Sequence, residues 1–230
     1  MNYASQRTLA GARTAAPDLL WVTYRWMTLG LATTGLVALG IAHSPAAIDA
    51  LIGNRILFYG LLFGQLGLVF ALSAAASRVS TPVAALMFLG YAALTGVTFS
   101  TLFLVYTASS IASTFFVTAG AFAGLSVFGA VTRRDLSAIG RFGLFALIGV
   151  VLASLVNLFL KSSGLEWLIT VVGVLLFAAL TAYDTQRLKA IFERGDAPAN
   201  LPLVGALTLY LDFINMFLFL LRIVGDRRRD

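Results

Sequence analysis

The chain has 230 residues, of which 60% are hydrophobic and 11% are charged, and its mean hydropathy is +0.93. Soluble globular domains carry about 25% charged residues, so this composition excludes an ordinary soluble domain. Sixteen Lys and Arg against ten Asp and Glu give a net charge of +6. Because these charges lie between apolar runs, they indicate membrane topology rather than a nucleic-acid surface. The absence of cysteine excludes disulfides and cysteine-ligated metals.

Residues 1–20 are predicted to form a cytoplasmic N-terminal tail. They contain Arg7 and Arg13 among Ala, Ser and Thr residues, without the continuous apolar core of a cleaved signal peptide. The single histidine, His43, falls in a short polar connection further along. We expect it to be a loop residue rather than a metal ligand.

Seven apolar segments follow the tail, each long enough at about 1.5 Å per residue to cross a hydrocarbon core about 30 Å thick. Short links favour a compact bundle of antiparallel neighbours. We therefore predict an all-α polytopic membrane protein with a single membrane domain, in which residues 21–223 form the bundle and 224–230 a basic C-terminal tail. The predicted spans are 21–42, 56–76, 83–106, 111–131, 142–160, 167–183 and 203–223.

Two pairs of glycines occur four residues apart, Gly60 with Gly64 and Gly120 with Gly124. Each pair lies on one face of a predicted helix, an arrangement that lets membrane helices approach closely. With 21 glycines in the chain, such pairs also arise by chance. Close helix packing is the prediction that these pairs support.

The last apolar segment carries an ionisable residue, Asp212, near its middle. A carboxylate at membrane depth costs roughly 2.5–3.5 kcal/mol on insertion scales, so it normally faces protein or water and takes part in function. The alternative is a neutral carboxyl, capped by Asn215, that only packs helices together. We expect Asp212 to face the bundle interior, while Phe213, Phe217 and Leu220 offer a lipid-facing side. The residues that share the helical face of Asp212, at steps of three and four, are Thr208, Asn215, Phe219 and Arg222.

A second carboxylate, Asp184, lies at the inner end of the sixth segment and shares a helical face with Thr181 and Thr185. The alternative here is an interfacial residue that pairs with Arg187 at i+3, a contact worth only a few tenths of a kcal/mol. Asp184 and Asp212 differ in expected depth. They meet only if the sixth helix continues past Arg187, if helices tilt, or if the chain ahead of the seventh segment lies outside the membrane.

Basic residues near the span ends predict a cytoplasmic N-terminus. With this orientation, ten Lys and Arg lie inside and two outside, up to the last segment. The side of the C-terminus stays open, because charge favours a last segment that enters and returns, whereas its length favours a crossing helix. The inner residues are Arg7, Arg13, Arg25, Arg78, Arg133, Arg134, Arg141, Arg187, Lys189 and Arg194, and the outer residues are Arg55 and Lys161.

Several ordered motifs mark the chain. They are LYLDFINMFLFLLRIVG at 209–225, GVLLF at 173–177 followed by AYDTQ at 182–186, and TRRDLS at 132–137 with Gly143 and Asn157. In these motifs, and more loosely over 82–96, the sequence resembles the Bax inhibitor-1 family of multi-spanning membrane proteins. The C-terminal motif is the most specific, and the others support it by their order and spacing.

The resemblance implies seven helices, with the last surrounded by the other six, and a passive, pH-sensitive calcium leak. It implies that Asp184 and Asp212 form a di-aspartyl pair that binds the ion and senses pH. A basic residue after the second helix, by position Arg78, is expected to latch the closed state. Some relatives carry an acidic residue in the second helix, where this chain has Gln65. Further residues expected to act in gating or beside the pair are Asn215 and Arg187.

The chemistry of such a pair can be stated from general principles. Two carboxyls at hydrogen-bond distance in a low-dielectric site cannot easily both ionise, so they share a proton and titrate as one unit. The protonated pair is a neutral plug, whereas the deprotonated pair offers oxygen ligands to a hard cation such as Ca²⁺. Water and backbone carbonyls must supply the remaining ligands. Such weak coordination suits a conduction path.

Two other functions compete with an ion leak. A non-catalytic modulator of a membrane-bound quality-control protease is the main alternative, since this role is also associated with bacterial members of the family. An intramembrane aspartyl protease is more remote. Such enzymes resemble a Gly-x-Gly-Asp pattern, where this chain has Tyr210-Leu211-Asp212.

We expect no catalysis and no organic cofactor, because no phosphate loop, hydrolase motif or nucleotide-binding turn is found in the sequence. The expected partners are the lipid bilayer and calcium ions, with a membrane protease as the alternative and no nucleic acid. We expect a monomer. Short loops, the absence of cysteine and the lack of organelle signals predict a multi-pass protein of the bacterial inner membrane.

Overall fold

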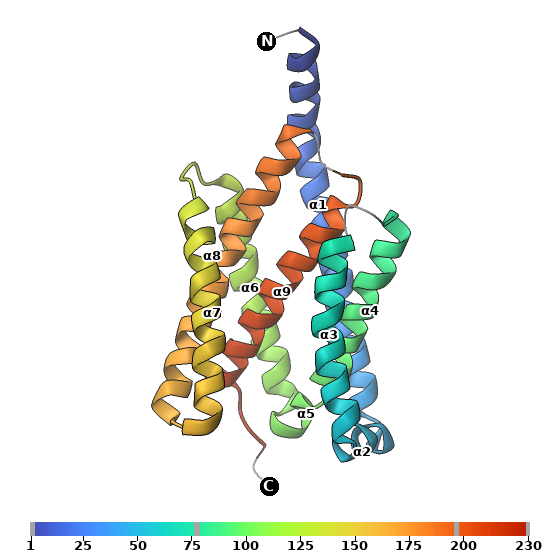
Figure 1. Ribbon diagram of the computed structural model, residues 1–230, viewed down its shortest axis with the longest axis vertical. Coiled ribbons are helices and arrows are strands. Elements are labelled where there is room, and N and C mark those ends of the chain that lie inside the picture. The colour runs from blue at the N-terminus through green and yellow to red at the C-terminus, as the bar shows by residue number, and fades with distance from the viewer. Residues whose placement is uncertain (1–2, 76–78, 196–197, 229–230) are drawn as a thin grey trace. The chain divides into compact units, whose positions relative to one another are not determined.

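The computed structural model describes residues 3–75, 79–195 and 198–228, and within them the chain is built of α-helices without β-strands (Figure 1). Seven of the described helical segments are long and apolar enough to cross a membrane. The all-α polytopic prediction is therefore confirmed. The helices are α1 (Tyr3–Ala42), α2 (Pro45–Gly53), α3 (Arg55–Ala75), α4 (Thr81–Phe99), α5 (Leu102–Val105), α6 (Ala108–Val131), α7 (Ser137–Leu160), α8 (Ser163–Arg194) and α9 (Leu201–Val224).

Helix α8 is longer than its apolar run indicated. The sequence placed the end of this span at residue 183, but the helix continues to Arg194. Polar residues such as Gln186 and Lys189 end the hydrophobic run, yet they are good helix formers. Leu188 and Phe192, four residues apart, are buried, which anchors the extension. Asp184 therefore lies well inside α8, and the first of the conditions for its meeting with Asp212 is fulfilled.

The connection after α1 also contains a helix that the sequence did not indicate. Helix α2 is nine residues long, too short to register as a span. It begins in a favourable way, because the Ser44 side chain accepts a hydrogen bond from the Ala47 N–H and Pro45 occupies the first turn. Ile48 and Leu51 are its buried residues.

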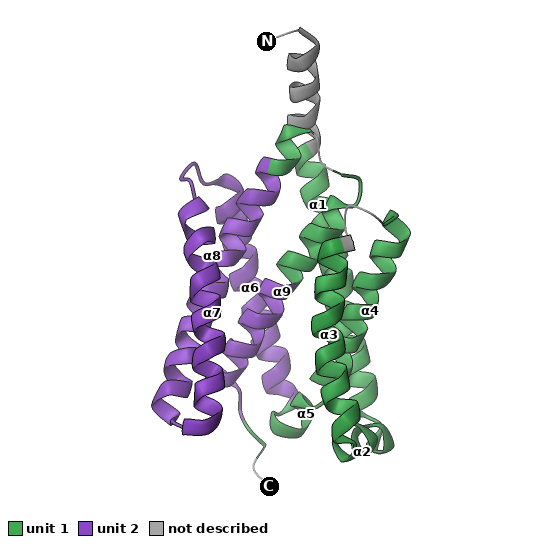
Figure 2. Ribbon diagram, viewed as in Figure 1, with its two compact units in different colours: residues 1–107, 191–210, 227–230 green, residues 108–190, 211–226 purple. Residues whose placement is uncertain are grey.

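The helices form two compact units, which interleave along the chain (Figure 2). Unit 1 contains residues 1–107, 191–210 and 227–230, and unit 2 contains residues 108–190 and 211–226. Two long helices change unit along their length, α8 after Ala190 and α9 after Tyr210. The candidate site residues Asp184 and Asp212 both belong to unit 2.

In unit 1, α4 packs against both α1 and α3. The contact with α1 is close because a Cβ at Gly96 would lie only 2.6 Å from the carbonyl oxygen of Thr34. Gln65, which stands where some relatives carry an acid, ties α3 to α4. Its Nε2 donates to the Leu94 carbonyl at 3.1 Å and to Thr98 Oγ1 at 3.2 Å.

Helix α9 is continuous from Leu201 to Val224, and unit 1 forms hydrogen bonds just outside both of its ends. Ahead of α9, the Asn200 side chain donates to the carbonyl of Val79, just before α4. Beyond α9, the N–H of Arg228 donates to the carbonyl of Val105, at the end of α5. The unbroken length of α9 suits a crossing helix, and the side of the C-terminus stays a prediction.

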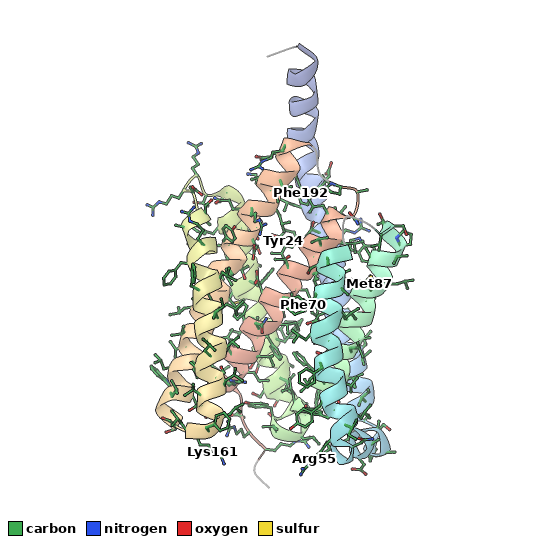
Figure 3. The ribbon with its side chains drawn as sticks, viewed as in Figure 1. Tyr24, Arg55, Phe70, Met87, Lys161 and Phe192 are labelled. Carbon is green, nitrogen blue, oxygen red and sulfur yellow. The ribbon has the colours of Figure 1, made fainter. Side chains whose placement is uncertain are left out.

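Two labelled side chains show where the two ends of unit 1 lie (Figure 3). Arg55, at the start of α3, lies at the opposite end of this unit from Phe192, near the end of α8. Between the ends, α3 exposes most of its surface, including Phe70 at 65%. In a membrane this exposed apolar surface faces lipid.

Helix α9 is the most buried of the candidate spans. The apolar window of α9 is 61% buried, against 6–39% for the other six. This burial agrees with the predicted central position of the last helix. The expectation that Phe213 and Phe217 face lipid is wrong, because their exposed fractions are 2% and 4%. These two rings of α9 therefore pack against protein.

The two predicted glycine pairs do not mediate close contacts. A Cβ at Gly60, Gly64, Gly120 or Gly124 would meet nothing within 4 Å among the described residues. Spacing alone does not tell which face of a helix meets a neighbour. In unit 2, an added Cβ would overlap an atom of a neighbouring helix at four other glycines, which are Gly129, Gly140, Gly143 and Gly173.

Candidate ion-binding site

The structure brings Asp184 of α8 and Asp212 of α9 together within unit 2. Their side chains form a hydrogen bond with each other, and their exposed fractions are 8% and 4%. A hydrogen bond between two carboxyls requires that one of them carry a proton. Oδ2 of Asp212 is otherwise buried without a partner among the described residues. The pair is therefore a buried acidic site in which two carboxyls from different helices contact each other and one carboxyl oxygen has no partner among the described residues.

Close packing positions the Asp184 side of the pair. At Gly129 of α6 a Cβ would overlap the backbone carbonyl of Ala182, and at Gly140 of α7 it would overlap the ring of Tyr183. Both contacts therefore require glycine on the neighbouring helix. They fix the turn of α8 immediately before Asp184 against α6 and α7.

Two side chains of α8 hold the neighbouring α6–α7 link. Gln186 accepts a hydrogen bond from the N–H of Leu136 at 2.9 Å and donates to the carbonyl of Arg134 at 2.8 Å. Lys189 Nζ donates to the carbonyl of Ala130 at 2.7 Å, in the last turn of α6. A cation is favourable there because the end of a helix presents unpaired carbonyls. Sequence reasoning missed these roles, although Gln186 closes the AYDTQ motif.

The same link carries an exposed carboxylate outside the spans, Asp135. The N–H of Ser137 donates to its Oδ1 at 2.9 Å. Hydrogen bonds with Ser137, assisted by the charge of Arg141, lower the pKa of Asp135. This carboxylate is therefore ionised throughout the neutral range and is not a candidate proton sensor.

Aromatic packing positions the Asp212 side of the pair. The ring of Phe213 lies 5.3 Å from that of Phe115 and 5.5 Å from that of Phe122, measured between centroids. Further along α9, Phe219 stacks on Phe177 at 6.0 Å. These contacts fix α9 against α6 and α8 in the turns that follow the acidic residue.

The polar neighbours on α8 follow the expected face. Thr181 and Thr185 are fully buried, and Thr181 Oγ1 donates to the carbonyl of Phe177 at 2.8 Å. Arg187 is exposed and interacts with Asp184 through its charge. Asp184 therefore interacts with the charge of Arg187 and also contacts Asp212, and its role in ion binding stays a prediction. Arg78, the expected latch, lies outside the described residues.

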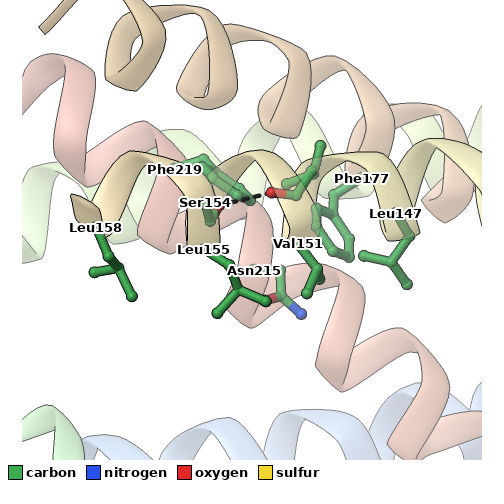
Figure 4. Close-up of a pocket in the computed structure, with 9 residues that line it drawn as sticks. Leu147, Val151, Ser154, Leu155, Leu158, Phe177, Asn215 and Phe219 are labelled. Atoms are coloured by element: carbon green, nitrogen blue, oxygen red, sulfur yellow. Dashed lines mark hydrogen bonds between the residues drawn. The ribbon is translucent and has the colours of Figure 1, made fainter. Parts of the chain in front are cut away.

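Asn215 lines a cavity of about 290 Å³ together with Phe177 and Phe219 (Figure 4). Its Nδ2 donates to the Leu211 carbonyl of its own helix at 2.8 Å. The other lining residues are apolar except Ser154, whose hydroxyl donates to the carbonyl of Val150. The amide of Asn215 is thus used within α9, and its role in gating stays a prediction.

Two hydroxyls of α6 were not singled out from the sequence. Thr114 Oγ1 and Ser126 Oγ are buried and, like Asp212 Oδ2, have no hydrogen-bond partner in the part of the chain that the structure describes. A buried polar atom without a partner costs about 1–3 kcal/mol. Their spacing on one helical face was the available signal, because Thr114, Thr118 and Ser126 are separated by multiples of four.

Comparison with known proteins places these features in a wider group. The family profile described as "Inhibitor of apoptosis-promoting Bax1" matches residues 17–229. Over 210 residues the chain is 53% identical to the inner membrane protein YbhL of Escherichia coli K12, covering 89% of this chain and 90% of that protein. A Deinococcus radiodurans protein is 47% identical over 225 residues, 96% of this chain and 94% of the relative. A Borreliella burgdorferi protein is 41% identical over 208 residues, 89% and 90% of the two chains.

Proposed function

Because the chain belongs to the Bax inhibitor-1 family, we propose that it is a passive, pH-sensitive calcium leak, gated by Asp184 and Asp212. The protein is a multi-pass protein of the bacterial inner membrane, with seven candidate spans in its described part. The observation that carries the proposal is the hydrogen bond between two buried carboxyls on different spans. A carboxyl pair at such a place is costly and normally functional.

The direction of the pH response follows from the shared proton. While the proton is held, the pair carries at most one negative charge and joins α8 to α9. When the proton leaves, the two carboxylates repel each other and offer oxygen ligands to a hard cation. Arg187 interacts with Asp184 through its positive charge, which favours the ionised state, whereas the charge of Asp212 opposes it. Calcium leak therefore increases as pH rises through the apparent pKa of the pair.

Calcium flux into proteoliposomes across a pH series tests the proposal. Wild type should leak more as pH rises, and Asp212→Asn should lose most of this response because an amide cannot release a proton. Asp49→Asn is the matched control, since Asp49 is an exposed carboxyl on α2. A pH response of Asp212→Asn equal to that of wild type would contradict the proposal.

The proposal includes no catalytic role and no cofactor other than the transported calcium ion. Bulky buried neighbours flank the acid on α9, with Tyr210 and Phe213 exposing 0% and 2% of their surface. This packing does not favour the close approach of a peptide substrate. The alternative of a protease modulator predicts that a membrane protease is retained on affinity purification, with no calcium flux from the same preparation.

A further inference from the structure

One face of α6 is polar and buried through most of the helix. Residues on this face recur at steps of four, so each lies about one turn from the last and the face winds by about 40° per step around the helix. All belong to unit 2, and each exposes 6% of its surface or less. They are Ser110, Thr114, Thr118, Phe122 and Ser126.

The hydroxyls of this face are not all used in the same way. Thr118 Oγ1 donates to the carbonyl of Thr114 at 2.7 Å, the usual arrangement for a threonine in a membrane helix. Thr114 Oγ1 and Ser126 Oγ have no such bond and no other partner among the described residues. Burial without a partner is unfavourable for a hydroxyl. These two groups are therefore available to water or to an ion.

Neighbouring contacts place Ser126 near the acidic pair. One turn before it, Phe122 packs on Phe213, the residue that follows Asp212. Three residues after it, Gly129 packs on the carbonyl of Ala182, two residues before Asp184. Ser126 thus lies on α6 between the two contacts that flank the carboxyls. Its free hydroxyl and the free Oδ2 of Asp212 occur in the same part of unit 2.

Phe122 separates the two free hydroxyls along this face. It lies between Thr118 and Ser126 in the series, is 4% exposed, and contacts the Phe213 ring at 5.5 Å. A constriction made by two aromatic rings excludes water, and such constrictions can gate ion paths by dewetting.

We propose that the buried face of α6 is the water-bearing wall of the ion path, with Ser126 supplying an oxygen beside the acidic pair and Phe122 closing the path against Phe213. The ligand is a hydrated cation, whose shell needs more oxygens than two carboxylates provide. The identity of the cation rests on the proposed function. The hydration of this wall does not depend on the proposed function, and it can be measured without any ion flux.

Cysteine reactivity measures this hydration directly, because the chain has no cysteine of its own. Charged thiol reagents attack the thiolate, which forms in water and not in hydrocarbon. Ser126→Cys and Thr114→Cys should react several-fold faster than Val127→Cys and Val117→Cys, with the reagent present on both sides of the membrane. Val127 and Val117 are matched controls on the same helix, exposed by 62% and 58%. Equal, slow reaction at all four positions would overturn the proposal.

Calcium leak tests the constriction. Phe122→Ala should raise the basal leak several-fold at a fixed pH, whereas Phe116→Ala should not, because Phe116 on the same helix is 72% exposed. An unchanged leak in Phe122→Ala would overturn the gate. Failures of the two proposals remain distinguishable. Reactive cysteines without calcium leak from wild type would overturn only the proposed function, whereas an Asp212-dependent leak with unreactive cysteines would overturn only the role of α6.

Discussion

Tyr210 and Asp212 are two residues apart on α9, and the helix buries their polar groups in opposite ways. The Tyr210 hydroxyl, in unit 1, lies 2.6 Å from Thr34 Oγ1, which also bonds the carbonyls of Ala92 at 2.9 Å and Gly30 at 3.0 Å. Carbonyls only accept, so Thr34 shares its single hydroxyl proton between these two carbonyls and accepts the Tyr210 proton. The rings of Phe88 and Tyr91 meet Tyr210 edge-on.

Asp212, in unit 2, has the titratable Asp184 as its partner, and its Oδ2 has no hydrogen-bond partner among the described residues. A neutral and fully paired network has one stable arrangement and anchors the helix that carries it. A carboxyl pair has two charge states, and its contacts change with the proton. We therefore propose that one half of α9 is an anchor and that the other half, which carries Asp212, is a switch.

The largest expected effect comes from a double-mutant cycle on the switch. Asp184→Asn and Asp212→Asn should each remove most of the pH response of calcium leak, because each removes the shared proton. The double variant should add little, since residues that act as one unit are not additive. Proteoliposome flux across a pH series measures all four forms. Independent, additive effects would show that the two carboxylates do not titrate together.

Packing around the switch is expected to be the next most sensitive feature. Gly129→Ala places a Cβ into the Ala182 carbonyl and should lower the free energy of unfolding by about 1–3 kcal/mol, as overpacking does. Gly120→Ala is the control on the same helix, because a Cβ there meets nothing within 4 Å. Thermal unfolding of both variants in detergent provides the measurement. Equal stability of the two would contradict the close α6–α8 contact.

A substitution in the anchor should change the stability of the protein and not the pH dependence of calcium leak. Tyr210→Phe removes one hydrogen bond while Thr34 keeps its two carbonyl partners, so the loss should be about 1 kcal/mol. Tyr59→Phe is the control, since Tyr59 is 56% exposed. The pH profile of calcium leak should match wild type in both variants. A changed profile in Tyr210→Phe would remove the distinction between the two halves of α9.

Much of this architecture could be predicted from the sequence, because hydrophobic length determines which segments span a membrane. The two candidate acids could also be identified from the sequence, since Asp212 interrupts an apolar run and Asp184 belongs to the AYDTQ motif. Their meeting could not be derived from hydropathy. The apolar run of α8 ends near Gln186 while the helix continues to Arg194, and helix propensity, not hydrophobicity, governs that extension.

Other features depend on which neighbours a helix has. The burial of Phe213 was missed because an apolar residue is compatible with both lipid and protein surroundings. Ser126 was missed for a related reason, since an isolated hydroxyl in a membrane helix usually bonds to its own backbone. The structure of α6 shows that the Ser126 hydroxyl makes no such bond.

The smallest effect is expected at the edge of the switch, where Arg187 acts on Asp184 through its charge. Arg187→Ala removes a positive charge that favours the ionised pair, so the midpoint of the leak profile should move to higher pH. The shift should be only a few tenths of a pH unit, because Arg187 is exposed and solvent screens its charge. Arg194→Ala, an exposed arginine further along α8, is the control. The shift should shrink as salt is raised. A shift in the opposite direction, or one that salt does not change, would mean that Arg187 does not act on Asp184 through charge.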